Sequence, residues 1–323
     1  MDLNALAAQL ADELARSQLG RRDTTGGAAD GGRPTPSASA AVPPPVVAPR
    51  GVHYERTVRL GDIVDHTLLR PEATRADVER LCAEAVDHRL ATVCVNPGWV
   101  PLCVAALRGS SVPVCTVVGF PLGASATEVK AAEAALAARQ GAQELDMVLA
   151  LGALRSGHWG IVERDIAAVV RAASGALVKV IVESAVLTPL ELVRVCGVAR
   201  EAGAHYVKTS TGFHAAGGAT EAAVALMRLA VGDALGVKAS GGVRDGATAL
   251  RMVAAGATRI GTSSGVQFAE VSGPGPRPLR DLLGALGDAE GLSPTPVGGL
   301  AAIATPAAGT ASVGEARARV TPY

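Results

Sequence analysis

The chain has 323 residues, 49% of them apolar, and its thirty acidic residues balance its thirty basic ones. Only eight side chains are aromatic and no dense basic block occurs, which argues against nucleic acid or an anionic membrane as a partner. No apolar run reaches the roughly 18 residues of a membrane-spanning helix, so we expect a cytoplasmic protein that acts on a small neutral or anionic metabolite.

Residues 1–54 are expected to form an N-terminal extension. Leucines spaced as on one face of a helix favour a short helix at the start, and the acidic residues among them are not typical of a secretory or mitochondrial leader. Residues 21–50 are rich in Gly, Pro and Ala without a period, which is the composition of a flexible linker.

Between residues 55 and 271, short β-branched runs alternate with helical patterns. The runs are 62–69, 91–96, 112–120, 143–149, 177–183, 205–210, 235–240 and 258–263. Eight strands alternating with helices are typical of a (β/α)₈ barrel, an α/β fold that builds its active sites at the carboxyl ends of the strands. We therefore predict a TIM barrel over residues 55–271, flanked by disordered extensions.

Two of the predicted helices carry start signals. Ser125 to Glu128 and Thr188 to Glu191 have the spacing of a capping box, and Pro189 follows at the first helical position. After residue 271 the composition again becomes rich in Gly, Pro and Ala, around one short helical pattern at 278–286. Residues 272–323 are therefore predicted to be a short helix and a flexible tail.

A weak internal repeat points to the functional rim. The dipeptide Gly-Ala at 141, 203 and 256 precedes a strand each time, and the fifth residue after each glycine is Asp146, Lys208 or Gly261. We expect these three positions to end their strands, which makes Asp146 and Lys208 neighbours across the barrel mouth.

Lysine is rare in this chain, with four among the thirty basic residues. The chain uses arginine where any positive charge would serve. The few lysines that remain are therefore candidates for work that needs an amine able to lose its proton. Lys208 and Lys238 are expected to end neighbouring strands, where two like charges disfavour double protonation, so that one amine should titrate below the ordinary lysine range. Such an amine can form a Schiff base, with Asp146 as a proton relay. The alternative is that both lysines bind phosphate or pair with carboxylates.

Other polar residues have weaker assignments. Lys179 and Glu183 share one face of a strand and could form an internal ionic layer, while Lys130 is interpreted as a surface or packing residue of a helix. His66 could line the cavity. The five cysteines form no CxxC pair and are interpreted as reduced core residues, with only Cys94 facing a cavity.

Three clusters of glycine and hydroxyl residues follow the last three predicted strands. They are residues 209–212, 240–242 and 261–265. Loops after the seventh and eighth strands of such barrels often hold phosphate through backbone N–H groups, and Arg244 could assist. The alternative is tight turns alone. GTSSG at 261–265 also fits the GxSxG pattern of serine hydrolases, but no histidine follows it, which excludes that triad order.

With these residues in view, the chain resembles the bacterial deoxyribose-phosphate aldolases over residues 60–270. The matching blocks are VDHTLLRPEAT, CVNP, VVGFPLGA, TEVKAAEA, ELDMV, GALRSG, VKVIVES, VKTSTGF, VKASGGVRD and IGTSSGV. Departures are Ala150, where many relatives have Asn, and Arg70, which replaces a common Lys.

The resemblance implies a class I aldolase without metal or other cofactor. It would cleave 2-deoxy-D-ribose 5-phosphate reversibly to D-glyceraldehyde 3-phosphate and acetaldehyde, in deoxyribonucleoside catabolism. Lys208 would then form the imine, Lys238 would activate it, and Asp146 would donate and accept protons. The resemblance assigns the phosphate and the remaining substrate contacts to Gly212, Gly241, Gly242, Ser263, Ser264, Asp65 and Thr67.

Two rival interpretations stay open. The chain could be another class I aldolase with a different phosphorylated substrate, or a phosphosugar-binding protein without turnover. The second is disfavoured because binding alone would accept arginine in place of the lysines. Barrels of this kind often pair through their helices, so a homodimer is the expected protein partner, beside the phosphosugar.

Overall fold

The computed structural model describes residues 56–285 of the chain. The helix and linker predicted within 1–54, and the tail predicted beyond residue 285, lie outside the described residues. In the described part no helix is long and apolar enough to cross a membrane.

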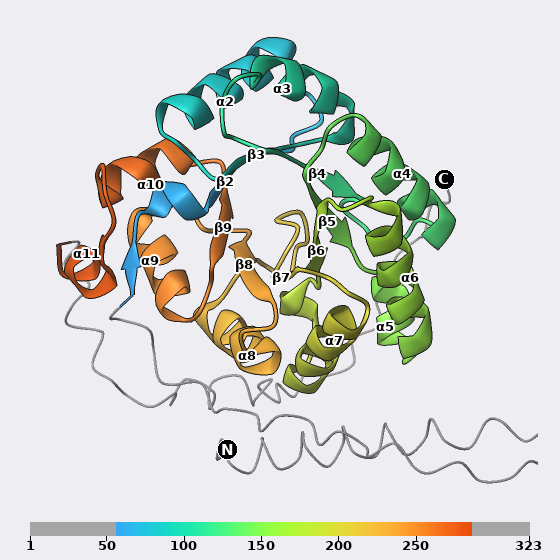
Figure 1. The fold of residues 1–323 in the computed structure, drawn as a ribbon. Coiled ribbons are helices and arrows are strands. Elements are labelled where there is room, and N and C mark those ends of the chain that lie inside the picture. The colour runs from blue at the N-terminus through green and yellow to red at the C-terminus, as the bar shows by residue number, and fades with distance from the viewer. Residues whose placement is uncertain (1–55, 286–323) are drawn as a thin grey trace, which may run out of the picture. The chain divides into compact units, whose positions relative to one another are not determined.

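Eight parallel strands form a closed barrel in chain order, from β2 next to β3 through to β9, which pairs back with β2 (Figure 1). The strands are β2 Val64–Leu68, β3 Thr92–Val95, β4 Val114–Val118, β5 Glu144–Val148, β6 Leu177–Ile181, β7 Tyr206–Lys208, β8 Gly236–Ser240 and β9 Arg259–Thr262. Each coincides with one of the predicted runs. The predicted TIM barrel is confirmed.

Helices surround the barrel on its outside (Figure 1). They are α2 Arg75–Asp87, α3 Val100–Ala106, α4 Thr127–Arg139, α5 Leu151–Arg155, α6 Trp159–Ala172, α7 Pro189–Glu201, α8 Glu221–Val231, α9 Gly246–Ala254, α10 Gly265–Ser272 and α11 Leu279–Ala285. Three short 3₁₀ turns add η1 Leu60–Ile63, η2 Pro97–Trp99 and η3 Ser184–Val186. The core lies between the strands and these helices, where the outward strand residues and inward helix residues are nearly all Val, Leu, Ile or Ala.

The helix starts test the predicted caps. Thr188 accepts a hydrogen bond from the Glu191 N–H while the Glu191 carboxylate accepts from the Thr188 N–H, so this capping box is confirmed. The prediction at Ser125 is wrong. Helix α4 begins one residue later, with Ala126 as its cap and no side-chain cap bond, so Ser125 lies outside the helix.

A second, two-stranded sheet joins the ends of the described chain. β1 (Thr57–Val58) pairs antiparallel with β10 (Arg277–Pro278), and α11 follows with Leu279, Leu282 and Leu283 buried. The predicted boundary at residue 271 falls within α10, and the helical pattern at 278–286 corresponds to α11.

The register of the barrel strands determines which charged residues lie next to one another on neighbouring strands. Lys208 pairs in register with Lys238, and Asp146 with Lys179. Lys208 ends β7, but Asp146 and Lys238 are the middle residues of five-residue strands, so the expectation that they end their strands is wrong. Tilt and stagger bring residues from different strand positions to one level inside a barrel, which is why they still meet Lys208.

Candidate active site

Asp146 lies at the centre of the barrel interior, bound by three lysines. Its Oδ2 accepts from the Nζ of Lys208 and from the Nζ of Lys238, each at 2.7 Å, and its Oδ1 accepts from Lys179 Nζ at 2.8 Å. Asp146, Lys179 and Lys238 are fully buried, and Lys208 is 3% exposed. The sequence therefore correctly predicted that Asp146 and Lys208 are neighbours.

A further set of charges continues the network towards the start of the strands. Asp65 contacts Lys238, and its Oδ1 accepts from Arg259 Nη1 at 2.7 Å. Glu144 lies 2.6 Å from Lys179 Nζ and 3.2 Å from Arg259 Nη2. These contacts connect the charged side chains of β2, β5, β6, β7, β8 and β9 into one cluster.

The cluster contains more positive than negative groups. Among the described residues, ion pairs join the side chains of Lys179, Lys208, Lys238 and Arg259 to only three carboxylates, those of Asp65, Asp146 and Glu144. One positive charge is therefore left without a carboxylate of its own.

Burial and charge act in opposite directions on these groups. Burial raises the pKa of Asp146, but the Lys179, Lys208 and Lys238 charges outweigh it and hold that pKa well below its usual range. Burial lowers the pKa of Lys238, and Asp146 and Asp65 reverse this, so the pKa ends above the usual lysine range. The same balance raises the pKa of Lys179. Asp146 is thus a carboxylate, and Lys179 and Lys238 are cations.

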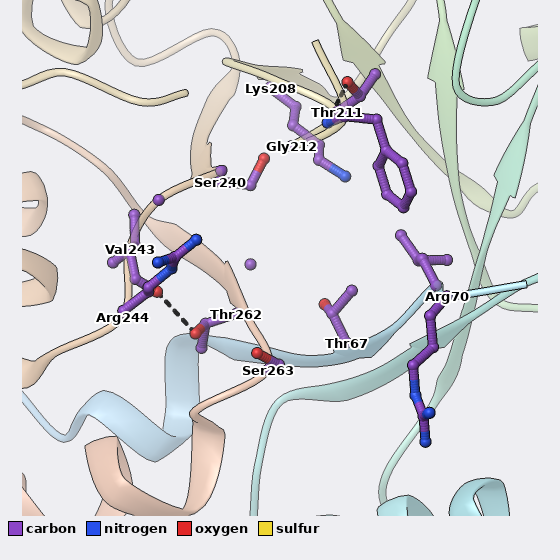
Figure 2. A pocket seen from close by; sticks show the side chains of 15 residues that line it. Thr67, Arg70, Lys208, Thr211, Gly212, Ser240, Val243, Arg244, Thr262 and Ser263 are labelled. Atoms are coloured by element: carbon purple, nitrogen blue, oxygen red, sulfur yellow. Dashed lines mark hydrogen bonds between the residues drawn. The ribbon is translucent and has the colours of Figure 1, made fainter. Parts of the chain in front are cut away.

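The cluster opens into a pocket of about 200 Å³ at the carboxyl ends of β2, β7, β8 and β9 (Figure 2). Figure 2 shows the Lys208 side chain pointing into this pocket, with Thr67, Ser263 and Arg244 on other sides of it. The predicted residues that line the pocket are Lys208, Thr67, Gly212, Gly241, Gly242, Arg244 and Ser263.

Four predicted residues lie beside the pocket and do not line it. Asp146, Lys238 and Asp65 form the charged layer beneath it. Ser264 caps α10 at the N-terminal side, with its N–H donating to Thr262 Oγ1 at 3.0 Å.

Backbone geometry explains the glycines of the pocket. Gly212, Gly241 and Gly242 have φ values of 83°, 83° and 81°, in the left-handed region that favours glycine. The loops are tied together, because Ser240 Oγ donates to Ser210 O at 2.6 Å. Thr262 Oγ1 also donates to Val243 O at 2.8 Å (Figure 2). This rim combines glycine-rich loops, the N-terminus of α10 and an arginine, which suits a phosphate group.

Several weaker assignments need correction. His66 does not line the cavity, since alternation along β2 turns it outward to Glu84, whose Oε2 lies 2.7 Å from Nε2. Lys130 is fully buried in the described structure and pairs with Asp165, so of its two predicted interpretations it is a packing residue and not a surface residue. Glu183 leaves the face of Lys179 because its backbone is left-handed, with φ 54°, and its carboxylate accepts from Thr211 Oγ1 at 2.7 Å.

Two contributions were missed by sequence reasoning. Arg259 completes the charged cluster, and its position just before an apolar strand residue gave little indication of an inward side chain. Phe213 lines the pocket and contacts Phe120 edge-to-face, with ring centroids 5.2 Å apart. The VVGFPLGA and VKTSTGF blocks contained these two rings, but only the fold brings them together.

Two groups of interior thiols and carboxylates have ligand atoms close enough together to be compared with a metal site. Within the described residues, Cys94, Cys115 and Asp146 offer ligand atoms within 4.8 Å of one another, as do Asp65, Cys115 and Glu144. The Lys179 ammonium group already lies at ion-pair distance from the Glu144 and Asp146 carboxylates. It therefore occupies the position that a metal cation would take beside them. All five cysteines are buried and free.

The chain is similar in sequence to known aldolases. Deoxyribose-phosphate aldolase of Streptococcus gordonii is 54% identical over 209 residues, which cover 65% of this chain and 94% of that protein. The Lysinibacillus sphaericus deoxyribose-phosphate aldolase is 58% identical over 205 residues, covering 63% of this chain and 92% of that protein.

The fold is also similar to that of solved aldolase structures. The aldolase QR15 superposes with a TM-score of 0.63 at 39% identity, covering 66% of this chain and 95% of the other. The tetrameric deoxyribose phosphate aldolase of Aeropyrum pernix has a TM-score of 0.61 at 39% identity, covering 65% and 89%. Residues 62–269 match the DeoC/LacD family aldolase profile. The chain therefore belongs to the DeoC/LacD family and is an aldolase, a carbon–carbon lyase.

Proposed function

We propose that the chain is a class I, Schiff-base aldolase that cleaves 2-deoxy-D-ribose 5-phosphate reversibly to D-glyceraldehyde 3-phosphate and acetaldehyde. One observation carries the proposal. The Lys208 amine reaches the pocket, and its Nζ donates a hydrogen bond to Asp146 Oδ2 at 2.7 Å. The reaction would serve deoxyribonucleoside catabolism in the cytoplasm.

Lys208 is the nucleophile in this proposal. Of the three lysines in the cluster it alone lines the pocket, whereas Lys179 and Lys238 are fully enclosed and held as cations by their carboxylates. The Lys208 amine attacks in the uncharged form. The neutral amine can then add to the substrate aldehyde.

The bond changes follow from the position of Asp146. Lys208 Nζ adds to C1 of the open-chain sugar, water leaves, and the protonated imine draws electrons from the neighbouring bond. The Asp146 carboxylate, directly or through water, takes the proton of the C3 hydroxyl as the C2–C3 bond breaks. The enamine is then protonated at carbon and hydrolysed, which frees acetaldehyde and the amine.

The phosphate group would lie at the rim. Gly212, Gly241 and Gly242 offer backbone N–H groups without a Cβ in the way, and Ser263 precedes the N-terminus of α10. Arg244 supplies a positive side chain from the loop after β8. Binding there would hold the glyceraldehyde half until the bond is broken.

The test is borohydride reduction in the presence of deoxyribose 5-phosphate, followed by peptide mass mapping. We expect one stable adduct, on Lys208, and none in Lys208→Arg, which keeps the charge but cannot form the imine at this position. An unmodified protein whose activity is lost on adding EDTA would contradict the proposal. A panel of phosphorylated aldehydes would separate this substrate from those of other class I aldolases.

A further inference from the structure

The chain has a second buried lysine site, away from the pocket. Lys130 of α4 is fully buried, and its Nζ lies 2.7 Å from Asp165 Oδ2 on α6, a side chain that is 1% exposed. The other Asp165 oxygen accepts from Thr127 Oγ1 at 2.9 Å. This pair is compensated and closed to solvent, and the mechanism above does not use it.

The contacts of Lys130 point towards the pocket rim. Its Nζ also donates to the C=O of Val148 at 3.0 Å, at the carboxyl end of the strand that carries Asp146. Its methylene chain packs against Gly119, where an added Cβ would lie 3.0 Å from Lys130 Cε. One residue therefore contacts the ends of both β4 and β5.

The loop after β4 is held at both of its ends. The Gly119 N–H donates to Glu133 Oε2 of α4 at 2.7 Å, and the Gly123 N–H donates back to Gly119 O at 2.8 Å. Gly123 lies against the Leu149 carbonyl, where a Cβ would come within 2.0 Å of the oxygen. The loop 119–123 thus has little freedom to shift relative to α4 and β5.

Phe120 is the residue of this loop that contacts the pocket residue Phe213. It packs on the small internal cluster of Leu69, Cys94, Cys115 and Val117 and meets Phe213 edge-to-face, with ring planes at 85°. Phe213 lines the pocket and is 53% exposed, so Phe120 is its main aromatic support.

We propose that Lys130, through its pair with Asp165, is a positioning residue that holds the 119–123 loop and thereby Phe120, which supports the Phe213 wall of the substrate pocket. The kinetic part of this inference rests on the proposed function, because it is measured with the proposed substrate. Lys130 touches no reacting atom and acts on substrate binding rather than on the chemical step.

Steady-state kinetics test whether Lys130 acts on substrate binding through Phe213. Lys130→Met alone leaves Asp165 buried without its partner, so the variant to use is Lys130→Met with Asp165→Leu, which replaces the pair by apolar side chains. We expect its KM for deoxyribose 5-phosphate to rise about tenfold with kcat within about twofold. In a Phe213→Leu background the same pair of substitutions should change KM by less than about twofold. An unchanged KM effect in that background would overturn the proposed route.

A measurement without turnover keeps the inference separate from the proposed function. The chain has three phenylalanines, Phe120, Phe213 and Phe268. Fluorine-labelled phenylalanine therefore gives three ¹⁹F resonances, and the fully buried Phe268 of α10 is an internal control. In the double variant the Phe120 and Phe213 resonances should shift while that of Phe268 stays.

A matched control variant excludes a general loss of stability. Val195→Ala opens a small cavity under α7, a helix that carries neither the pair nor the loop, and it should leave the three resonances and KM unchanged. Shifts of equal size at all three rings, or in the control, would overturn the positioning role. If the wild type fails to cleave the sugar, the proposed function fails, and the ¹⁹F result still decides whether Lys130 positions the wall.

Discussion

The molecule buries lysine in two ways. Around Lys130 one cation meets one carboxylate in a closed space between α4 and α6. Around Lys208 four cations share three carboxylates in a space that opens into the pocket. The compensated site gives structure and the uncompensated site gives reactivity. Charge balance and access together, rather than burial alone, distinguish a structural lysine from a chemical one.

The two sites should differ most in catalytic activity when each lysine is substituted in turn. Lys208→Met deletes the nucleophile, so kcat/KM for deoxyribose 5-phosphate should fall by at least about 10³-fold. Lys130→Met removes no reacting group and should reduce kcat/KM by no more than about tenfold per folded molecule. A steady-state cleavage assay on folded fractions compares them. Equal losses would mean that the two sites do not differ in function.

Stability should show the opposite order. Lys130→Met leaves Asp165 buried without a cation, which costs about 3–5 kcal/mol of unfolding free energy. Lys208→Met removes only the surplus cation, because Asp146 keeps Lys179 and Lys238, and should cost less than about 1 kcal/mol. Urea unfolding monitored by circular dichroism gives both values. A larger cost at Lys208 would show that the cluster holds no surplus charge.

The pH profile tests how the surplus acts. Lys238 stays charged because Asp146 and Asp65 raise its pKa against the effect of burial. In Lys238→Leu the cluster has three cations for three carboxylates, so protonation of the nucleophilic amine is less opposed. The acidic limb of the kcat/KM profile should move to higher pH by about one to two units.

The control for this shift is a distant charge. Arg155→Leu removes an exposed cation that pairs with Glu191, and it should leave the profile where it is. A Lys238→Leu profile that superimposes on that of the wild type would remove Lys238 from its assigned role.

The smallest expected effect is at the surface, where solvent weakens charge pairs. Burial raises the pKa of Glu191, but hydrogen bonds from Thr188 and the charge of Arg155 outweigh it, so the pKa is lowered. The stabilisation is complete above the ordinary glutamate range and disappears as pH falls through the lowered pKa. Glu191→Gln should therefore cost about 0.5 kcal/mol at neutral pH and nothing in acid, measured by thermal unfolding. A constant cost across pH would mean that charge is not its origin.

The sequence was sufficient for the barrel and for the meeting of Lys208 with Asp146. Strand runs with β-branched residues repeat clearly, and a residue at the same phase of each repeat faces the same interior. The glycine-rich loops were found for a similar reason, because a left-handed backbone at Gly241 or Gly242 leaves few alternatives to glycine.

The remaining features depend on partners far apart in the chain. Lys130 shows the spacing of a helix residue, and only Asp165, 35 positions later, turns it into a buried pair. Arg259 reaches Asp65 across 194 positions. Helical and strand periods report which face a residue occupies, but they do not report the height at which side chains from tilted strands meet.

The short β1–β10 pair has a consequence for how the barrel can be built. It places Thr57 opposite Pro278, and the Leu279 N–H donates to Arg56 O at 2.9 Å, so the first described residue lies beside the start of the last helix, α11. A short glycine-rich linker from Ala285 back to Arg56 would make the eight units a continuous ring, which could be opened at an exposed turn such as Ser174–Gly175. The resulting circular permutant should fold with the same interior charges, because the barrel is defined by which strands are neighbours and not by which of them comes first.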